Sequence, residues 1–200
     1  PSCPLAQTDS GWRLQGKKYW ISAGASATHF AVLADSSNGL AWVLVAKNAA
    51  GLSCETFPTH DGKGGANCHF DLPISDDQIL LTGDAAAEAL SAFRECAMIL
   101  SSAETLGAAQ AALDTTVDYT KQREQFGQPL ASFQALQHRM ANMLIQTELT
   151  RSLVYSACDA ADHDSPDRGR FARAAKVKSA AVGRKVTQEA IQLHGGIATT

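Results

Sequence analysis

The sequence predicts an α+β protein in which an antiparallel β-sandwich or barrel domain precedes an antiparallel helical bundle. Three observations predict this order. Short apolar runs separated by turn residues continue to about Leu81, alanine, leucine, glutamine and glutamate dominate from Asp84 onward, and glycine becomes rare there. The change near Gly83 predicts two domains, a β domain at residues 1–83 and a helical bundle at residues 84–200.

The strands are expected where short apolar runs stand between turn residues. These runs lie at residues 31–33, 40–46, 52–57 and 66–72. Strands at such close spacing are typical of a sandwich or barrel. Trp12 and Leu14 before Gly16, with Tyr19–Ile21 after it, predict a first hairpin. The stretch at residues 71–77, which contains Pro73, is expected to be the exit from the β domain.

The helices are expected where apolar residues recur at helical spacing. One long helix from about Ala85 to Tyr119 carries the apolar positions Phe93, Leu100, Leu106, Leu113 and Val117. Gly127 and Pro129 then break the chain. A second helix places on one side Leu136, Met140, Met143, Leu144 and Leu153. Short loops between such helices imply an antiparallel bundle.

The third helix has recognisable start and stop signals. Ser165-Pro166-Asp167 predicts a cap with proline at the first helical position. The helix reaches His194, where Gly195-Gly196 can supply a left-handed stop.

The composition excludes several classes of protein. Apolar residues make up 45% and charged residues 18% of the 200 residues, which excludes disorder for the chain as a whole. Seventeen basic and twenty acidic residues give a net charge of -3, so we expect no nucleic-acid partner and no acidic membrane surface. No apolar stretch approaches the roughly 18 residues of a membrane span, and the first residues do not resemble a signal peptide.

The five cysteines are odd in number and form no C-x-x-C pair: they are Cys3, Cys54, Cys68, Cys96 and Cys158. This spacing argues against a disulfide scaffold or a zinc site, and it favours a reducing, cytoplasmic location. Each cysteine is expected to be a small buried hydrophobe. Cys54 and Cys68 fall on neighbouring predicted strands, so a bridge between them remains open.

No general catalytic motif is present in the sequence. It contains no G-x-S-x-G, no P-loop, no Rossmann fingerprint and no H-E-x-x-H. Residues 62–65, Gly-Lys-Gly-Gly, link two predicted strands and do not open a helix, so a hairpin is expected there. His60, Asp61, His69 and Asp71 could be drawn together as metal ligands, but histidines at strand turns are usually solvated, and we expect no metal.

Two segments carry more specific chemistry. The first is residues 119–138, in which Arg123 follows the end of a helix. This arginine could favour the negative helix end, or it could offer a bidentate donor to a phosphate, with Gln125 and Gln134 adding neutral hydrogen bonds. The second is residues 190–196, where glycine allows a ligand to approach the backbone. Each segment considered singly is more typical of a cap.

Together and in this order, the motifs of the chain resemble the acyl-CoA dehydrogenase family. The resemblance is carried by Gly11-Trp12-x-Leu14-x-Gly16-x-Lys18, Trp20-Ile21-Ser22, Arg123-Glu124-Gln125-Phe126-Gly127 and Gln192-x-x-Gly195-Gly196. It covers nearly all residues and corresponds to the middle β domain and the C-terminal helical domain of that family. The fold it implies agrees with the one expected from composition.

The resemblance implies FAD as cofactor and assigns the flavin ring to the β domain. Trp20 and Ser22 match the strand that lies against the ring, with the hydroxyl near its reactive N5 edge. The alternative for Trp20 is a core aromatic of a strand.

The resemblance assigns the adenosine diphosphate part of FAD to the bundle. Arg123, Gln125 and Phe126 match a segment that reaches across a dimer interface to the pyrophosphate and adenosine, and Gln134 extends that contact. Phe126 as an apolar plug of the bundle and Gln134 as part of a helix cap remain the alternatives.

The loop expected to close on the same moiety contains Gln192, Gly195 and Gly196. Ala198 stands where the family carries a third glycine, so this turn departs from the family pattern.

The catalytic base is unassigned. In the family, a glutamate at one of two positions removes the α-proton; one position corresponds to Ala97, and the other lies beyond Thr200. Alanine cannot take a proton. Glu95 lies about 200° around the helix from Ala97, and Glu104 shares its face but lies roughly 10 Å along the axis. That exceeds the reach of a general base, so Glu104 is only a weak candidate.

The activity implied by the resemblance is α,β-dehydrogenation of an acyl-CoA with hydride transfer to FAD. The implied partners are an electron-transfer flavoprotein and further copies of the chain, in a homodimer or tetramer. The N-terminal domain and final helices of the family are missing, so we expect the 200 residues alone to be inactive. The alternatives are a flavin monooxygenase or oxidase of the same fold, and a non-catalytic subunit that completes the FAD site of a heteromeric (heterotetrameric) dehydrogenase.

Overall fold

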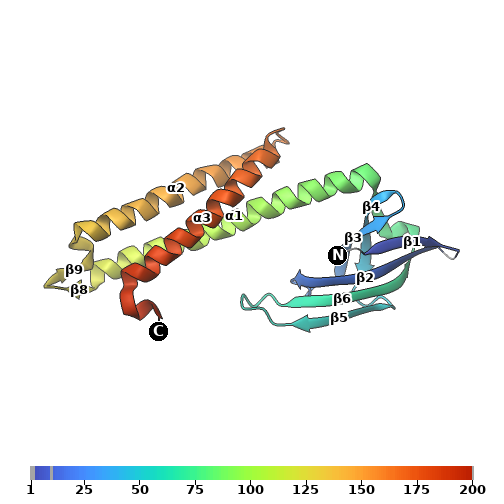
Figure 1. The fold of residues 1–200 in the computed structure, drawn as a ribbon, viewed down its shortest axis with the longest axis horizontal. Helices are drawn as coiled ribbons and strands as arrows, with labels where there is room; N and C mark the ends of the chain where they lie inside the picture. The colour runs from blue at the N-terminus through green and yellow to red at the C-terminus, as the bar shows by residue number, and fades with distance from the viewer. Residues whose placement is uncertain (1–2, 10, 200) are drawn as a thin grey trace. The chain divides into compact units, whose positions relative to one another are not determined.

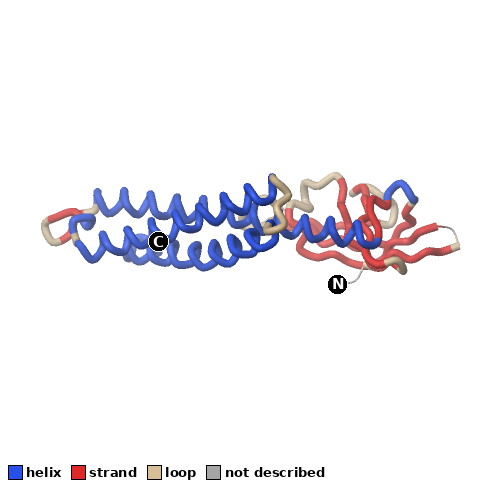
Figure 2. The backbone as a smooth tube through the Cα atoms, turned by 90° about the horizontal axis from the view of Figure 1, so that it is seen from above, coloured by secondary structure: helices blue, strands red, loops and turns tan. Residues whose placement is uncertain are grey.

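The computed structural model describes residues 3–9 and 11–199. The chain divides into two compact units, Pro1–Ser91 and Ala92–Thr200, which we name the β unit and the helical unit. Figure 2 shows the strands of the large sheet gathered in the β unit and the long helices running side by side in the helical unit.

The change in secondary structure and the division between compact units fall at different residues. The last strand of the β unit ends at Thr82, and helix α1 (Gly83–Gln122) follows at once. Its first turns nevertheless belong to the β unit, because the indole N–H of Trp42 donates a hydrogen bond of 3.1 Å to the carbonyl of Ala86, which is fully buried.

Seven strands form one sheet in the β unit (Figure 1). They are β1 (Pro4–Thr8), β2 (Gly11–Ser22), β3 (His29–Ser36), β4 (Gly39–Ala46), β5 (Leu52–Phe57), β6 (Gly65–Ile74) and β7 (Ile79–Thr82). Their order is β5-β6-β2-β1-β3-β4-β7, and every neighbouring pair is antiparallel except β1 and β3. The α+β class and the four predicted strand segments are confirmed. β5 and β7 remain unpaired edges within the described residues, so the sheet is open and the barrel alternative is wrong.

The core of the β unit follows from the period of two along each strand. In β6 the side chains of Ala66, Cys68, Phe70, Leu72 and Ile74 are buried, and those between them are more exposed. They join buried residues of β1 to β4 in one apolar cluster, which includes Leu14, Val32 and Val43.

Two expectations about the strands are wrong. Residues 11–22 form one continuous strand, because Gly16 lies inside the ladder opposite Phe70; the first hairpin is formed by β1 and β2 instead. Pro73 does not end the sheet, since β6 continues to Ile74. A short 3₁₀ helix (Asp76–Gln78) then leads into β7, which pairs with β4.

The cysteines differ from their predicted role. Cys54 and Cys68 face each other in register between β5 and β6 and form a disulfide, the possibility that their spacing left open. Cys3 is buried as expected, whereas Cys96 is exposed and Cys158 is half-buried. The expectation that every cysteine is a buried hydrophobe is therefore wrong for Cys96 and for the bridged pair.

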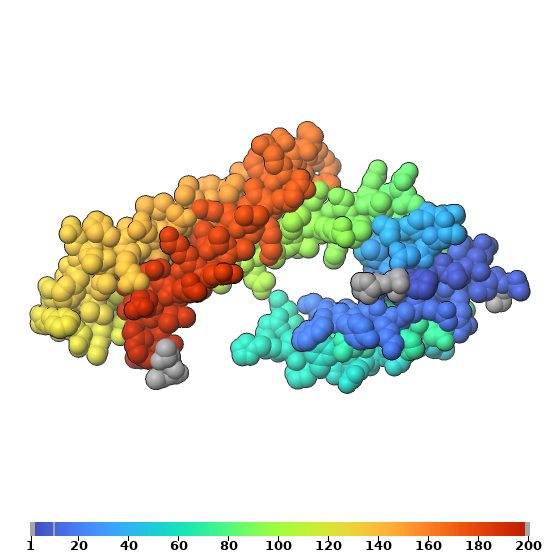
Figure 3. Space-filling view, viewed as in Figure 1, coloured from blue at the N-terminus to red at the C-terminus, as the bar shows by residue number. Residues whose placement is uncertain are grey.

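The helical unit is an antiparallel arrangement of α1, α2 (Gln134–Asp162) and α3 (Arg168–His194). Between α1 and α2 lie a small hairpin, β8 (Glu124–Gln125) with β9 (Gln128–Pro129), and a 3₁₀ turn (Leu130–Ser132); a further 3₁₀ turn (Gly195–Thr199) follows α3. The space-filling view shows α2 and α3 in contact along their length (Figure 3).

The three helices exist as predicted, but their buried faces differ from the apolar pattern. Phe93 and Leu100 of α1 are 61% and 69% exposed, and Leu144 of α2 is 48% exposed. The buried line of α1 passes instead through Ile99, Ser102, Leu106, Ala109, Leu113, Thr116 and Thr120. Small and hydroxyl side chains therefore occupy several of the buried positions of α1 that recur at helical spacing.

The start of α3 also differs from the prediction. Pro166 lies in the preceding turn, and the helix begins at Arg168 with Asp167 as its N-cap residue. The predicted stop at its other end is confirmed, because Gly195 is the C-cap residue with a φ of 65°.

Candidate functional site

A hollow of about 480 Å³ lies at the end of the helical unit where α1 ends and α3 ends. Five of the predicted cofactor-binding residues line it: Arg123, Gln125, Gln192, Gly195 and Gly196. They come from two segments about 70 residues apart in the sequence. The structure therefore brings together the two segments that carried the specific chemistry.

Arg123 is positioned by the break between α1 and the β8–β9 hairpin. Its backbone N–H donates to the Tyr119 carbonyl at 2.8 Å and so closes the last turn of the helix. Its own carbonyl accepts from the Leu130 N–H, also at 2.8 Å, which fixes the far end of the hairpin. The guanidinium makes no hydrogen bond or ion pair with any residue that the structure describes. A cation without a protein partner is available to an anionic ligand.

The other wall of the hollow is the stop of α3. The Gly195 N–H donates to the carbonyls of Ile191 and Gln192, and its φ of 65° with ψ of -145° is a conformation that essentially only glycine adopts. A Cβ placed on Gly195 or on Gly196 would meet no atom within 4 Å. The backbone of this loop is thus open to close approach by a ligand.

Two residues of the hollow were missed by the sequence interpretation as site residues. Tyr119 and His194 stack with ring centroids 4.4 Å apart and planes at 23°. The Tyr119 hydroxyl lies 3.4 Å from the His194 carbonyl, and His194 Nδ1 donates to the Ala190 carbonyl at 2.8 Å, which leaves Nε2 as the acceptor of the neutral ring. Tyr119 begins the first of the two segments and His194 lies within the second, which was the only signal for them in the sequence.

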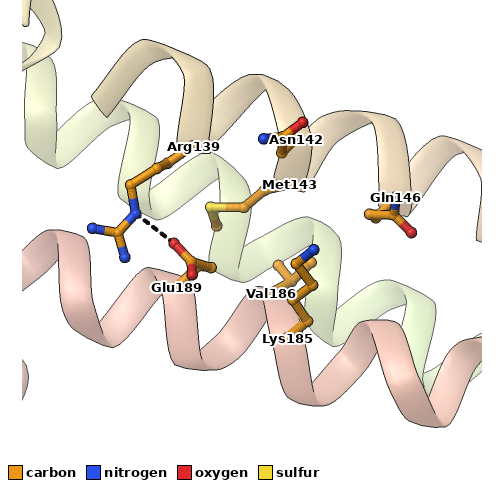
Figure 4. A pocket seen from close by; sticks show the side chains of 7 residues that line it. All are labelled: Arg139, Asn142, Met143, Gln146, Lys185, Val186 and Glu189. Carbon is orange, nitrogen blue, oxygen red and sulfur yellow. Dashed lines mark hydrogen bonds and ion pairs between the residues drawn. The ribbon is translucent and has the colours of Figure 1, made fainter. Parts of the chain in front are cut away.

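A smaller hollow of about 180 Å³ between α2 and α3 is lined by an arginine that forms an ion pair within the protein (Figure 4). Arg139 Nε donates to Glu189 Oε2 at 2.6 Å, so its charge already has a partner. Lys185 and Gln146 also line this hollow, and none of the predicted site residues does. The contrast with Arg123 favours the larger hollow as an anion site.

Phe126 and Gln134 lie outside the lining of the larger hollow. Phe126 occupies the tip of the β8–β9 hairpin, is 90% exposed, and has a φ of 57°, followed by Gly127 at 79°. This is the backbone of a two-residue hairpin turn, but with a bulky aromatic where small residues are the norm. The rings of Phe126 and Phe133 lie edge-to-face, with 6.2 Å between their centroids. Gln134 is the exposed first residue of α2. Phe126 is therefore no plug of the bundle.

Trp20 and Ser22 lie in the β unit, at the end of β2. Trp20 is 77% exposed and has a φ of 55°, where the register between β2 and β6 is broken between Lys18 and Ile21. Ser22 is exposed opposite Gly65. The core alternative for Trp20 is wrong. A bulky residue in the left-handed region is an observed backbone outlier, and such outliers cluster at ligand sites.

The position expected for the catalytic base holds no acid. Ala97 is exposed on α1, and Glu104 is exposed seven residues further along the same helix. Glu95 is held by Arg168 of α3, with Nε of the arginine 2.5 Å from Oε2, so it is engaged in packing the helices. The second position for a base lies beyond Thr200, outside the described residues.

Two kinds of feature are absent from the described residues: a cluster of metal ligands and a membrane-spanning helix. No three histidine, cysteine, aspartate or glutamate side chains in residues 3–9 and 11–199 converge as a set that could hold a metal ion. Over the same residues, no helix combines the length and the apolar character that crossing a membrane requires.

The chain is similar to known proteins over most of its length. Residues 86–200 match the family described as "Acyl-CoA dehydrogenase, C-terminal domain". The Mycobacterium tuberculosis protein named "Probable acyl-CoA dehydrogenase FadE25" is 32% identical over 94% of this chain and 51% of its own length. The chain spans about half the length of the curated relatives it matches.

Solved structures match over the whole chain. The ChsE4-ChsE5 complex from Mycobacterium tuberculosis is 25% identical with a TM-score of 0.85, over 100% of this chain and 54% of the other. The FAD complex of PigA is 26% identical with a TM-score of 0.86, over 100% and 54%.

Proposed function

Because the chain belongs to the acyl-CoA dehydrogenase family, we propose that it forms part of an enzyme that uses FAD to dehydrogenate an acyl-CoA between its α and β carbons. Members of this family are FAD flavoproteins, and PigA is seen in complex with FAD. The observation that carries the proposal is the hollow in which Arg123 faces the open Gly195–Gly196 loop.

The residues of the hollow fit the pyrophosphate of FAD. Arg123 offers planar, charged donors, and the amides of Gln125 and Gln192 add neutral ones. The two glycines let a phosphate approach the backbone without a steric obstacle. Their role is to bind and orient; Phe126 and Gln134 are proposed to extend this contact to a site completed by a second subunit.

Trp20 and Ser22 of the β unit are proposed to contact the flavin ring. The indole offers a flat apolar face, and the hydroxyl can donate or accept a hydrogen bond at the ring edge. FAD supplies the acceptor for the hydride that leaves the β-carbon. What these side chains do is hold that acceptor in place and exclude water from it.

The proton at the α-carbon must go to a base that this chain does not supply at Ala97. A second candidate function follows from that observation: a non-catalytic subunit whose residues complete the FAD site of a related partner. The match to a structure of two different proteins, the ChsE4-ChsE5 complex, also favours it. A dehydrogenase made of one kind of subunit instead needs its base outside these 200 residues.

The proposed partners follow from the same reasoning. We propose an acyl-CoA as substrate, an electron-transfer flavoprotein as electron acceptor, and a dimer or tetramer built through the helical unit, with identical or related subunits. α2 exposes the apolar side chains Leu144, Ile145, Leu149 and Tyr155, which an interface would cover. A cytoplasmic location is proposed from the spacing of the cysteines. The Cys54–Cys68 disulfide argues against a reducing compartment. Thiol trapping in intact cells, which shows whether this pair is oxidised, tests the proposed location.

The test of the proposed function is the flavin and its reduction. The full-length protein is expected to purify with FAD, and an acyl-CoA added without oxygen is expected to bleach the flavin band. Absence of flavin by absorbance and calorimetry contradicts the proposal.

Composition of the purified sample separates the two candidate functions. A related subunit that co-purifies, and without which no acyl-CoA bleaches the flavin, supports the partner-subunit function. Bleaching by the 200-residue chain alone with FAD, abolished in Glu104→Gln, would instead identify Glu104 as the base.

A further inference from the structure

The backbone of Trp20 needs support from its surroundings. Its φ of 55° is unfavourable for a bulky L-residue, and its ring is 77% exposed, so burial of the ring does not hold it there. β2 and β6 lose their regular register between Lys18 and Ile21, so Trp20 has no register partner on β6. Something other than the sheet ladder must fix this residue.

Two side chains from neighbouring strands make the contacts that the ladder does not. Asn67 of β6 accepts a hydrogen bond from the Trp20 N–H through its Oδ1, at 3.1 Å. Phe57, the last residue of β5, packs against the indole with ring centroids 5.0 Å apart and planes at 70°. An edge-to-face aromatic pair restricts both rings. The N–H and the ring of Trp20 are thus held by separate residues.

The place of Phe57 depends on glycine across the strand pair. Phe57 and Gly65 are register partners, and a Cβ on Gly65 would lie 2.5 Å from Cε2 of the Phe57 ring. Only glycine leaves room for the ring in this place.

The disulfide ties the two strands that carry this support. β5 is the edge of the sheet, and β6 is its only neighbouring strand among the described residues. Cys54 of β5 is bridged to Cys68 of β6, three residues from Phe57 on one strand and next to Asn67 on the other. A covalent link at an otherwise open edge keeps both supporting side chains at a fixed separation.

We propose that Asn67 and Phe57 are positioning residues that hold the Trp20 indole outward in one pose, and that the Cys54–Cys68 bridge secures them. An indole held in this pose presents its face to a planar aromatic ring. Identifying that ring as the flavin rests on the proposed function. Neither positioning residue needs to touch that ligand, because each acts through Trp20.

The experiment follows the Trp20 indole N–H signal by NMR in full-length protein labelled with ¹⁵N-tryptophan. Trp20→Phe assigns the signal by its loss. Phe57→Ala and Asn67→Leu are expected to shift and broaden it and to increase quenching of tryptophan fluorescence by acrylamide. Phe57→Tyr keeps the ring and Asn67→Asp keeps the acceptor, so both are expected to restore the wild-type signal. A merely destabilised β unit would not be rescued in this selective way.

Reduction of the wild type supplies a test that needs no substitution. A dithiol reductant donates two electrons and two protons to the bridge, forms its own disulfide and leaves two thiols at Cys54 and Cys68. Mass spectrometry counts the thiols, and the Trp20 signal is expected to broaden as hydrogen exchange in residues 52–57 accelerates. Cys96→Ser is the matched control, because this exposed cysteine is not bridged and its loss is expected to change neither readout.

FAD affinity, measured separately, distinguishes this inference from the proposed function. Phe57→Ala and Asn67→Leu are expected to weaken FAD binding about 2- to 10-fold. A Trp20 signal unchanged in both variants and in the reduced wild type overturns the positioning role, whatever the affinity. A shifted signal with unchanged FAD affinity, in these variants and in Trp20→Phe, supports the positioning of the ring and overturns its contact with flavin.

Discussion

The β unit and the helical unit bury different kinds of side chain. The β unit encloses Leu14, Val43, Phe70 and Leu72 in a single apolar cluster, each at most 2% exposed. The buried polar side chains of the described chain all lie in the helical unit: Ser102, Thr116, Thr120, Thr147, Thr150 and Ser179. Each donates to a carbonyl of its own helix, so none is left unsatisfied.

The difference shows in what each unit leaves at its surface. The helical unit packs through small and hydroxyl residues together with apolar ones such as Leu113 and Val186. Several of its large apolar side chains, such as Phe93, Leu100 and Leu149, are nevertheless more than half exposed. Apolar area that does not contribute to folding remains available for association. The β unit is thus held by one apolar cluster, whereas the interior of the helical unit includes polar side chains and several of its large apolar side chains lie at its surface.

The largest effect expected from this comparison concerns the β core. Phe70→Ala removes a fully buried ring and is expected to lower the free energy of unfolding by about 3–5 kcal/mol. Leu149→Ala, at a side chain 51% exposed, is expected to change it by less than about 0.5 kcal/mol. Urea denaturation of the full-length variants, followed in each unit by hydrogen exchange, measures both. Equal decreases in the free energy of unfolding for the two variants would show that both side chains are buried alike. They would contradict the difference drawn between the two units.

The next largest effect is a change in FAD affinity with no change in the stability of the fold. Arg123→Ala is expected to weaken FAD binding about 10- to 100-fold, because a charge-assisted hydrogen bond to phosphate contributes about 1.5–3 kcal/mol. The unfolding midpoint of the apoprotein is expected to stay unchanged, since no described residue pairs with this guanidinium. Arg139→Ala is the matched control: it breaks the pair with Glu189 and is expected to leave FAD affinity unchanged. Calorimetric titration with FAD decides, and equal affinities for wild type and Arg123→Ala exclude the role of Arg123.

The order and kind of elements could be predicted from the sequence because each kind has its own local signal. Short apolar runs between turn residues identified the strands around Val32, Val43 and Phe70, and helical spacing with start and stop signals identified the three long helices. The buried face of α1 could not be predicted from apolar residues alone, because it is completed by Ser102, Thr116 and similar side chains. Phe93 and Leu100 fitted the same spacing and are exposed.

Long-range pairing set the other limits. Glycine is typical of turns, so the sequence around Gly16 predicts a turn. Its pairing with Phe70 on β6, which is distant in sequence, places it within a strand instead. The spacing of Cys54 and Cys68 permits a bridge, but the register of β5 on β6 is what places them opposite each other. In the site, Arg123 and Gly195 were each ambiguous as helix caps, and the structure shows them lining one hollow.

A smaller effect on folding, with a clear effect on assembly, is expected on α2. Ile145 and Leu149 lie one helical turn apart and are about half exposed. Changing both to glutamate is expected to weaken self-association or partner binding in sedimentation experiments, because two charges would have to be buried at the interface. Gln188→Glu adds a charge at an exposed polar position of α3 and serves as the control. An unchanged sedimentation coefficient in the double variant would exclude this face as an interface.

The smallest expected effects are those of pH, and they have opposite signs in the two units. In the β unit, hydrogen bonds from Gln15 and from Arg13 hold the pKa of Asp71 below its ordinary value. In the helical unit, the hydrogen bond from His163 to the Asp159 carbonyl, with the nearby Asp159 carboxylate, raises the pKa of His163 above its ordinary value. All five side chains are at the surface, so water screens both effects.

The sign of each effect follows from which state binds the proton more tightly. The unfolded chain protonates Asp71 first, near pH 3.9, so its contribution to stability is present above that pH and is lost as the pH falls through the lower pKa of the folded state. The folded chain holds the proton of His163 more tightly, so its contribution is present below about pH 6.5 and is lost as the pH rises through the folded pKa. Asp71→Asn is expected to flatten only the acidic limb of the stability curve, and His163→Gln only the limb just above neutrality. Urea denaturation of full-length protein across this pH range measures both limbs. Variant curves that run parallel to the wild type throughout would show that neither contact differs between the folded and unfolded states.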